Sequence, residues 1–134
     1  MAEIRIKTSS LCELVDITHE INAEIPPSLT CGICHLFCPH TTAGLTVNEN
    51  ADPDVKHDLL AKLDRLIPST ETYYRHAEGN SAAHLKASLM GFSHVLPVRS
   101  GRLVLGTWQG VYLCEFDGPR TRTVRLYFQK AEEK

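Results

Sequence analysis

The chain has 134 residues, an apolar fraction of 43%, a charged fraction of 22% and a net charge of −2. These values are typical of one globular domain over residues 1–134 that is long enough to bury a sizeable core. No basic run supports nucleic-acid binding, and no apolar run reaches the roughly 18 residues of a membrane helix. The N-terminus has no signal-peptide pattern and the cysteines number five, so we expect a cytoplasmic protein without a complete disulfide framework.

Strands alternate with one short helix in the N-terminal part of the chain. The β-type segments are apolar or alternate polar with apolar side chains, and they cover residues 3–7, 11–15, 31–37 and 45–47. Residues 11–15 are expected to continue the first strand across a turn. Asp16 is placed to cap a helix over residues 17–24, which Pro26-Pro27 ends. One face of this helix carries Ile17, Ile21 and Ile25.

Two longer helices come next, and strands close the chain. Asp52 and Pro53 predict a helix that runs to about Ile67, with an apolar stripe of Val55, Leu59, Leu63 and Leu66. Asn80 or Ser81 caps a second helix over residues 82–90. The remaining strands are predicted over residues 95–98, 103–105, 107–116 and 123–129, with a tight turn at Ser100-Gly101. This order of elements predicts an α+β fold with a mostly antiparallel sheet.

The segment 38–49 carries polar side chains in a stretch that otherwise suits a buried strand. It contains an imidazole at His40, hydroxyls at Thr41 and Thr42, and a carboxylate at Glu49. Burying such groups costs several kcal/mol unless they find partners. Gly44 allows another backbone or a ligand to approach closely. We interpret this segment as one wall of a site, with Glu49 as a candidate general acid or base.

Three histidines from different elements could meet in space. His40, His76 and His84 lie in a strand, a loop and a helix, and together they could form an open metal site with water as the fourth ligand. His84 shares a helix face with Ser81 and Ser88 rather than with the leucines, which suggests that it points into a cleft. No local metal-binding spacing supports the cluster, so separate hydrogen-bonded or surface histidines stay an open alternative.

A second group of residues favours anion binding. Arg120 and Arg122 lie close together after a turn, and the helix start at Asn80 offers backbone donors. Gln109, between two glycines, is typical of a pocket floor. The alternatives are a solvated hairpin loop and a tryptophan packed at a β-bulge. The cysteines near the site, Cys31, Cys34 and Cys38, are better explained as small buried hydrophobes than as ligands.

Three stretches of this sequence resemble a known family. They are His40-Thr41-Thr42-Ala43 with Asn48-Glu49-Asn50, the segment from Gly79-Asn80 to Ser88, and Gly106-Thr107-Trp108-Gln109-Gly110. Their order and spacing over nearly the whole chain are similar to those of the YjbQ-like family. The resemblance implies a β-sheet barrel or sandwich with helices on one side, assembled as a homotrimer. It also implies a divalent metal, zinc or magnesium, bound by His40, His76 and His84.

The resemblance further implies a thiamine-phosphate synthase activity, which joins hydroxymethylpyrimidine diphosphate to thiazole phosphate and releases pyrophosphate. The protein is then expected to be a metal-dependent transferase acting on a small phosphorylated metabolite. Its expected catalytic residues are Glu49, His40 and His84, and its expected phosphate-binding residues are Thr41, Thr42, Asn80, Gln109, Arg120 and Arg122. Two alternatives stay open: a non-catalytic trimeric protein that binds a metal or anion, and a metal-dependent phosphate-ester hydrolase.

Overall fold

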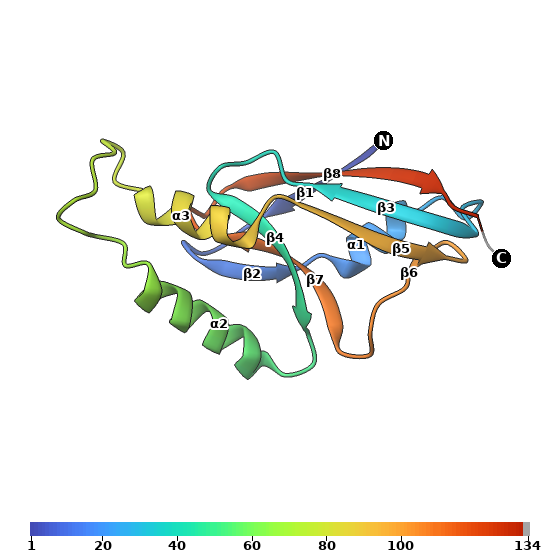
Figure 1. The fold of residues 1–134 in the computed structure, drawn as a ribbon, viewed down its shortest axis with the longest axis horizontal. Coiled ribbons are helices and arrows are strands. Elements are labelled where there is room, and N and C mark those ends of the chain that lie inside the picture. Colours follow the sequence, from blue (N-terminus) through green and yellow to red (C-terminus); the bar gives the residue numbers. More distant parts are fainter. Residues whose placement is uncertain (133–134) are drawn as a thin grey trace.

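The computed structural model describes residues 1–132, which form antiparallel sheets and three helices (Figure 1). In chain order the elements are β1 (Ala2–Lys7), β2 (Glu13–Asp16), α1 (Thr18–Glu24), β3 (Cys31–Phe37), β4 (Ala43–Glu49), α2 (Pro53–Leu66), α3 (Ser81–Met90), β5 (Ser93–Arg99), β6 (Arg102–Leu103), β7 (Gln109–Glu115) and β8 (Thr121–Lys130).

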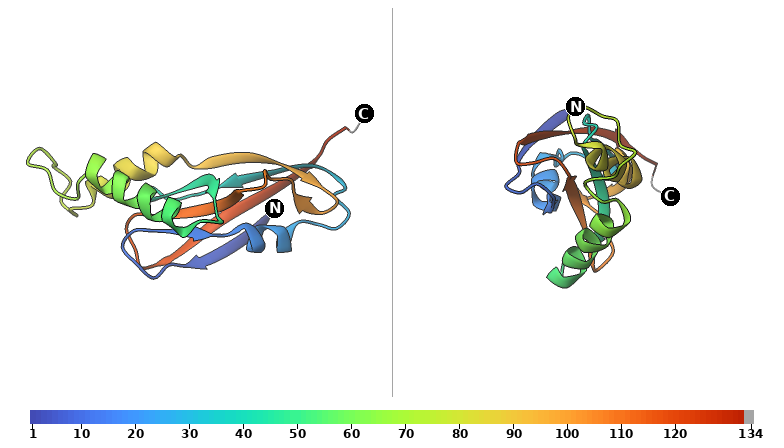
Figure 2. Two further views of the ribbon diagram at one scale, coloured as in Figure 1. Left: turned by 90° about the horizontal axis from the view of Figure 1, so that it is seen from below. Right: turned by 90° about the vertical axis from the view of Figure 1, so that its left-hand side faces the viewer.

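The strands form two sheets that curl into a half-barrel, as the end-on view in Figure 2 shows. One sheet has the order β1-β8-β3-β5-β6 and the other has the order β2-β7-β4. Every strand pair in them is antiparallel. Helices α2 and α3 lie at the same end of the molecule, and α1 lies between the sheets (Figure 1). The expected α+β fold with an antiparallel sheet is therefore confirmed.

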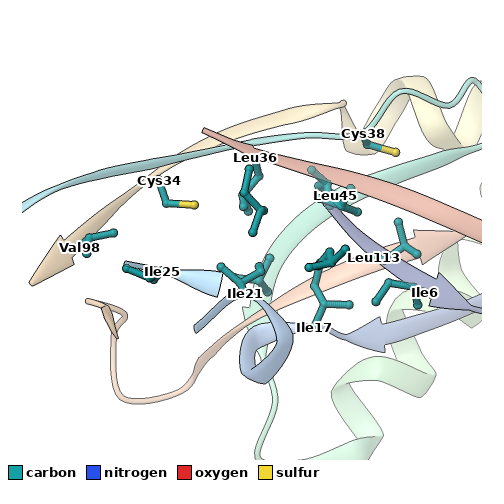
Figure 3. Packing of buried hydrophobic residues seen from close by; sticks show 14 of the residues in the cluster. Ile6, Ile17, Ile21, Ile25, Cys34, Leu36, Cys38, Leu45, Val98 and Leu113 are labelled. Carbon is teal, nitrogen blue, oxygen red and sulfur yellow. The ribbon is translucent and has the colours of Figure 1, made fainter. Parts of the chain in front are cut away.

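The main hydrophobic core lies where α1 packs between the two sheets (Figure 3). The isoleucines predicted for one face of this helix are all buried, with Ile17 and Ile21 at 0% exposure. They pack with Leu36 of β3, Leu45 of β4 and Leu113 of β7. Complete burial of one such side chain contributes roughly 1.5–3 kcal/mol. The short helix is therefore held by its buried face, since seven residues are too few for an isolated helix.

The cysteines behave as small core residues. All five are free in the described structure, and Cys34, Cys38 and Cys114 are buried. Burial raises the pKa of the Cys34 thiol to about 11 and that of Cys114 to about 12, so both thiols stay protonated near neutral pH. The expectation of buried hydrophobes is therefore confirmed for Cys34 and Cys38, whereas Cys31 is only partly buried.

Two predicted strand and helix details are wrong. Residues 11–15 do not continue the first strand, because β2 pairs with β7 in the other sheet, with Leu14 opposite Cys114. The chain changes sheets after β1, where Thr8 N–H donates to the Arg120 carbonyl at 2.9 Å. The apolar stripe of α2 is also only partly used: Leu63 is buried, whereas Leu66 is 60% exposed.

Helix α3 packs through alanines rather than leucines. Its buried side chains are Ala82, Ala83, Lys86 and Ala87, whereas Leu85 and Leu89 are 48% and 60% exposed. Small alanine side chains let the helix axis approach the three-stranded sheet closely, so the larger leucines are turned outward. The implied leucine core face is therefore wrong.

The predicted Asp52 cap and the Ser100-Gly101 turn are confirmed, whereas α1 begins at Thr18 with Ile17, not Asp16, as its N-cap residue. The Asp52 carboxylate accepts a hydrogen bond from Asp54 N–H at 2.9 Å at the start of α2. Ser100 and Gly101 have φ values of 52° and 73°, as a tight hairpin turn requires. Asn80 precedes α3 but makes no capping bond with its side chain. Within residues 1–132, no helix combines the length and the apolarity that crossing a membrane requires.

Candidate functional site

The site lies where α3 rests on β4, and Gly44 makes that contact possible. A Cβ atom at this position would lie 2.7 Å from the Gly91 carbonyl oxygen and 3.0 Å from the Met90 Cβ. The Leu45 N–H instead donates to the Gly91 carbonyl at 3.0 Å. The close approach predicted for Gly44 is therefore confirmed, and the partner is backbone.

A cavity of about 510 Å³, here called the neutral cavity, lies between α3 and the turn before β4. Its polar groups are the His40 and His84 imidazoles and the Thr41 and Ser88 hydroxyls, and its lining contains no Asp, Glu, Lys or Arg of the described chain. The full lining consists of His40, Thr41, Ala43, His84, Ala87, Ser88, Gly91 and Phe92. Two of the three predicted metal ligands therefore share one cavity.

His40 is held in one tautomer by the backbone of β8. The Thr123 N–H donates to the His40 Nε2 at 2.9 Å, so this nitrogen must be the unprotonated one. Burial lowers the pKa of His40 from its ordinary value of 6.5, and the nearby Arg122 charge lowers it further. The imidazole is therefore neutral at pH 7, carries its proton on Nδ1, and can offer a ligand only an N–H donor.

A second cavity of about 280 Å³, here called the charged cavity, adjoins the first. Thr41 and His84 line both cavities, so the two form one cleft. His76 reaches the charged cavity from the loop before α3, and its ring meets that of His84 edge to face with centroids 5.3 Å apart. The lining consists of Thr41, Thr42, His76, Glu78, Asn80, His84, Asp117 and Arg120.

Arg120 supplies the cation of the charged cavity. Its side chain is 50% exposed, and it donates to Asp117 through Nε to the backbone carbonyl at 2.9 Å and through Nη2 to the carboxylate at 3.1 Å. The Asn80 Nδ2 donates to the same carboxylate at 2.9 Å. Asp117 is thus offset by two donors, and it fixes the guanidinium beside the start of α3.

Arg122 differs from the sequence expectation, because the structure places it in the interior. It is 2% exposed and donates to Glu115 through Nε at 2.9 and 3.1 Å, and through Nη2. The Nη2 also donates to the Thr42 hydroxyl at 2.8 Å and to the Thr42 carbonyl at 3.2 Å. The Arg122 guanidinium is therefore committed to Glu115 and Thr42 and is not free for an anion in the cleft.

Glu49 and Gln109 lie at the far end of β4 and β7, where they face each other in register. Glu49 lies six residue steps along β4 from Ala43, a distance of about 20 Å at the usual rise of a strand. The Glu49 Oε2 accepts from Asp52 N–H at 3.2 Å, and the Gln109 Oε1 accepts from Gly106 N–H at 2.8 Å. The structure therefore does not bring these two residues to the histidines within one chain.

The predicted metal centre is not assembled in one chain. A neutral imidazole has one lone pair, and that of His40 already accepts the Thr123 N–H. Within residues 1–132, no three His, Cys, Asp or Glu side chains are grouped so that they could hold a metal ion. The ligand set of His40, His76 and His84 is therefore a correction to the sequence interpretation, and a divalent cofactor stays a prediction without a site.

Sequence reasoning missed Glu115, a buried carboxylate below the cleft that binds Arg122. Glu115 is 0% exposed, and it accepts hydrogen bonds from the Thr8 hydroxyl at 2.8 Å and from Asp117 N–H at 3.0 Å. Burial raises its pKa, but the Arg122 and Asp117 hydrogen bonds outweigh burial and hold the pKa below 4.5. The signal was a lone carboxylate inside the apolar run 111–116, since a buried charge requires a buried partner.

Comparisons with known proteins match almost the entire chain. A family model described as "UPF0047 protein YjbQ-like" matches residues 2–131. UPF0047 protein YugU of Bacillus subtilis is 54% identical over 90% of this chain and 92% of its own. UPF0047 protein MJ1081 of Methanocaldococcus jannaschii is 51% identical over 88% and 86%.

Solved structures agree with the fold. A crystal structure of an uncharacterised YjbQ/UPF0047 protein from Clostridium acetobutylicum has a TM-score of 0.91 and 48% identity, covering 96% of this chain and all of that one. The conserved hypothetical protein TT1486 of Thermus thermophilus also has a TM-score of 0.91, with 45% identity and the same coverage.

These comparisons correct the predicted activity. The matching proteins are described as UPF0047 or uncharacterised proteins, and the descriptions given above name no thiamine-phosphate synthase. The described residues also hold no group of metal ligands. The prediction of a metal-dependent transferase with thiamine-phosphate synthase activity is therefore wrong, as is its zinc centre. The metal-dependent hydrolase and the metal-binding form of the non-catalytic trimer relied on the same ligands and are withdrawn with it. Anion binding by a trimer did not rely on those ligands.

Proposed function

The chain belongs to the UPF0047 family of YjbQ-like proteins, and from that premise we propose that the cleft around His84 binds a small phosphorylated molecule and catalyses a proton transfer on it. The observation that carries the proposal is that His84 and Thr41 line both the neutral and the charged cavity. One ligand can therefore contact a cation at one end and a histidine donor at the other.

The charged cavity supplies the contacts that a phosphate group needs. The Arg120 guanidinium is half exposed and already oriented by Asp117, and charge-assisted bonds to phosphate are among the strongest hydrogen bonds in proteins. Helix α3 has ten residues and begins at Ser81, next to the cavity-lining Asn80, so its backbone dipole favours a negative charge there. Thr41 adds a hydroxyl at the junction of the two cavities.

The histidines divide the acid–base work between them. His40 offers only its Nδ1–H, so its role is to donate a hydrogen bond to an oxygen where negative charge develops. His84 faces both cavities and is the group placed to accept a proton from a ligand that spans them. This division requires no metal ligand from either ring. Glu49 lies too far along β4 to take part within one chain.

Isothermal titration calorimetry on the full chain, after treatment with a chelator, tests the binding step with inorganic phosphate and glycerol 3-phosphate. We expect Arg120→Gln to weaken binding about 10- to 100-fold, which corresponds to the loss of a charge-assisted hydrogen bond. Arg125→Gln is the matched control, because Arg125 pairs with Glu3 on the outer face of the sheet. Equal affinities for the wild type and Arg120→Gln would overturn the proposal, as would binding that returns only with added divalent metal.

Solvent deuterium exchange tests the proton transfer. A panel of phosphorylated metabolites is incubated with the protein in heavy water, and incorporation at carbon is followed by NMR. We expect one class of compound to exchange with the wild type and with His57→Asn, since His57 is exposed on α2. The His84→Asn variant is expected to lose the exchange. Exchange that survives His84→Asn, or no exchange with any compound, contradicts a proton-transfer role.

We propose in addition that the protein is a cytoplasmic homotrimer. The outer face of the five-stranded sheet exposes Val95 by 56% and Tyr127 by 45%, both directly opposite His35 of β3. Phe92 beside the cleft is 61% exposed. Exposed apolar groups gathered on one face favour association, and the free cysteines suit a reducing compartment. Light scattering should give three chains per particle and fewer for Tyr127→Glu; a monomeric wild type contradicts the trimer.

A further inference from the structure

Two consecutive residues of β8 bind the same turn, one through its side chain and the other through its backbone. The Arg122 side chain points into the interior and donates to both oxygens of Thr42. The next residue, Thr123, donates its backbone N–H to the His40 Nε2. The Arg122 side chain holds Thr42 and the Thr123 backbone holds His40, so this dipeptide fixes both ends of the segment 40–42, about 80 residues away in sequence.

The Thr123 N–H is available to His40 because strand pairing stops short of it. The β3–β8 ladder ends at the pair Phe37 and Arg125, just before Pro39 enters the turn. A backbone N–H at this place needs another acceptor, and the imidazole supplies it. The hydrogen bond thus extends the sheet by one side chain, and it exists only while the 40–42 turn keeps its position.

The position of that turn depends on a buried ion pair. Arg122 and Glu115 have side-chain exposures of 3% and 0%, and Glu115 also accepts from Thr8 and from the Asp117 backbone. The Thr42 carbonyl accepts both the Arg122 guanidinium and the Phe116 N–H at 3.2 Å. A planar guanidinium that bonds a carboxylate and a turn together is well suited to fix backbone geometry.

We infer that Arg122, held by Glu115, is a positioning residue: by anchoring Thr42 it keeps the His40 Nε2 on the Thr123 N–H and presents the imidazole to the cleft as an Nδ1–H donor. The inference relies on the proposed function only for the use that the cleft makes of this donor. The tautomer itself is a property of the free protein. Arg122 therefore serves the site without touching a ligand.

The tautomer of His40 can be read directly from the ¹⁵N chemical shifts of its ring, because protonated and unprotonated nitrogens differ. Spectra are recorded at about pH 8, above the ordinary histidine pKa. The wild type should show the Nδ1–H form as the dominant species. Arg122→Met should shift the ratio of the two tautomers by about fivefold toward the Nε2–H form, because the turn moves and the hydrogen bond from Thr123 N–H to His40 Nε2 is lost. Arg125→Met, on the outer face of the same strand, should leave the ratio unchanged.

Two further variants separate positioning from simple stability. Glu115→Met/Arg122→Met replaces the whole buried pair by apolar side chains, which often restores stability, and the double variant should regain unfolding free energy but not the tautomer ratio. Thr42→Val removes only the hydroxyl acceptor of Arg122, so it reports on a folded protein if Arg122→Met does not fold, and it should shift the ratio in the same direction.

An unchanged His40 tautomer in the double variant and in Thr42→Val overturns the inference. So does a wild-type protein in which the Nε2–H form dominates. Neither result depends on a ligand, whereas the phosphate titration does not measure the tautomer. A failure of the proposed function and a failure of this inference are therefore distinguishable.

Discussion

Arg120 and Arg122 lie two residues apart, and the structure gives them opposite environments. Each pairs with a nearby acid: Arg120 with Asp117 of the β7–β8 connection, and Arg122 with Glu115, the last residue of β7. The Arg120 side chain is 50% exposed because it still belongs to the turn before β8, whereas that of Arg122 is 3% exposed inside the half-barrel. Arg120 is therefore available to a ligand, whereas Arg122 stabilises the interior.

The contrast follows from the cost of moving charge out of water. An exposed ion pair is solvated and screened, so it contributes at most about 1 kcal/mol. A buried pair is different, because removing one partner leaves an uncompensated charge in the interior. The Arg120 guanidinium can therefore bind a ligand with little loss of stability, whereas the Arg122 guanidinium is needed to neutralise Glu115.

The largest effect expected from this comparison is the loss of stability in Arg122→Met. The variant leaves the Glu115 carboxylate buried without its cation, so the free energy of unfolding should fall by about 3–5 kcal/mol. Urea unfolding measures this value. Arg125 is also in β8, and it forms a partly exposed ion pair with Glu3 of β1. Arg125→Met should lower the free energy of unfolding by less than about 1 kcal/mol. Equal losses in the two variants would remove the distinction between buried and exposed arginines.

The pH dependence of stability gives a smaller effect and sharpens the comparison. The pKa of Glu115 is lowered in the folded protein from its ordinary value of 4.5, so in this range the unfolded chain binds more protons than the native one. The contribution of Glu115 is complete above about pH 4.5 and is lost as the pH falls through the folded pKa. Unfolding midpoints between pH 3 and pH 6 should therefore fall in acid for the wild type.

The two arginine variants should separate in the same measurement. Arg120→Gln keeps the Glu115–Arg122 ion pair, so its unfolding midpoint should fall in acid as that of the wild type does. In Arg122→Met this fall in acid should flatten or reverse, because the buried carboxyl then prefers its neutral form. An Arg122→Met profile that parallels the wild type would show that another group causes the acid dependence.

The smallest expected effect on stability is that of Arg120→Gln. Its loss should stay within about 1 kcal/mol by urea unfolding, although the same variant is expected to lose most of its affinity for phosphate. Loss of Arg122 should therefore reduce stability more than loss of Arg120 does, whereas loss of Arg120 should directly remove a contact to phosphate. A destabilisation of several kcal/mol would mean that the ion pair of Arg120 with Asp117 stabilises the fold, as the pair of Arg122 with Glu115 does.

Local signals in the sequence were sufficient for most secondary structure. The isoleucine spacing of the first helix, the Asp52-Pro53 start of α2 and the limits of β3 depend on periodicity and capping within a few residues. The alanine face of α3 was misjudged, because hydrophobicity alone favours leucines for a core. Close contact at Gly44 instead rewards the smallest side chains.

The candidate site was predicted in part for the same reason. His40, Thr41, His84, Asn80 and Arg120 do line one cleft. The roles of Arg122 and Glu49 could not be read from their neighbours in sequence. Arg122 was indistinguishable from Arg120 until β8 was placed in register, and Glu49 lies on the same strand as the motif but about 20 Å along it.

The sequence by itself determined the family, the α+β class, the free buried cysteines and the residue types available for anion and proton chemistry. The tertiary structure decided which arginine reaches the cleft, which nitrogen of His40 carries the proton, and that the three histidines do not form a metal centre in one chain. The physical reason is that periodicity and capping report short-range preferences. The burial of a charge and the use of a lone pair depend on partners that strand register brings in from distant parts of the chain.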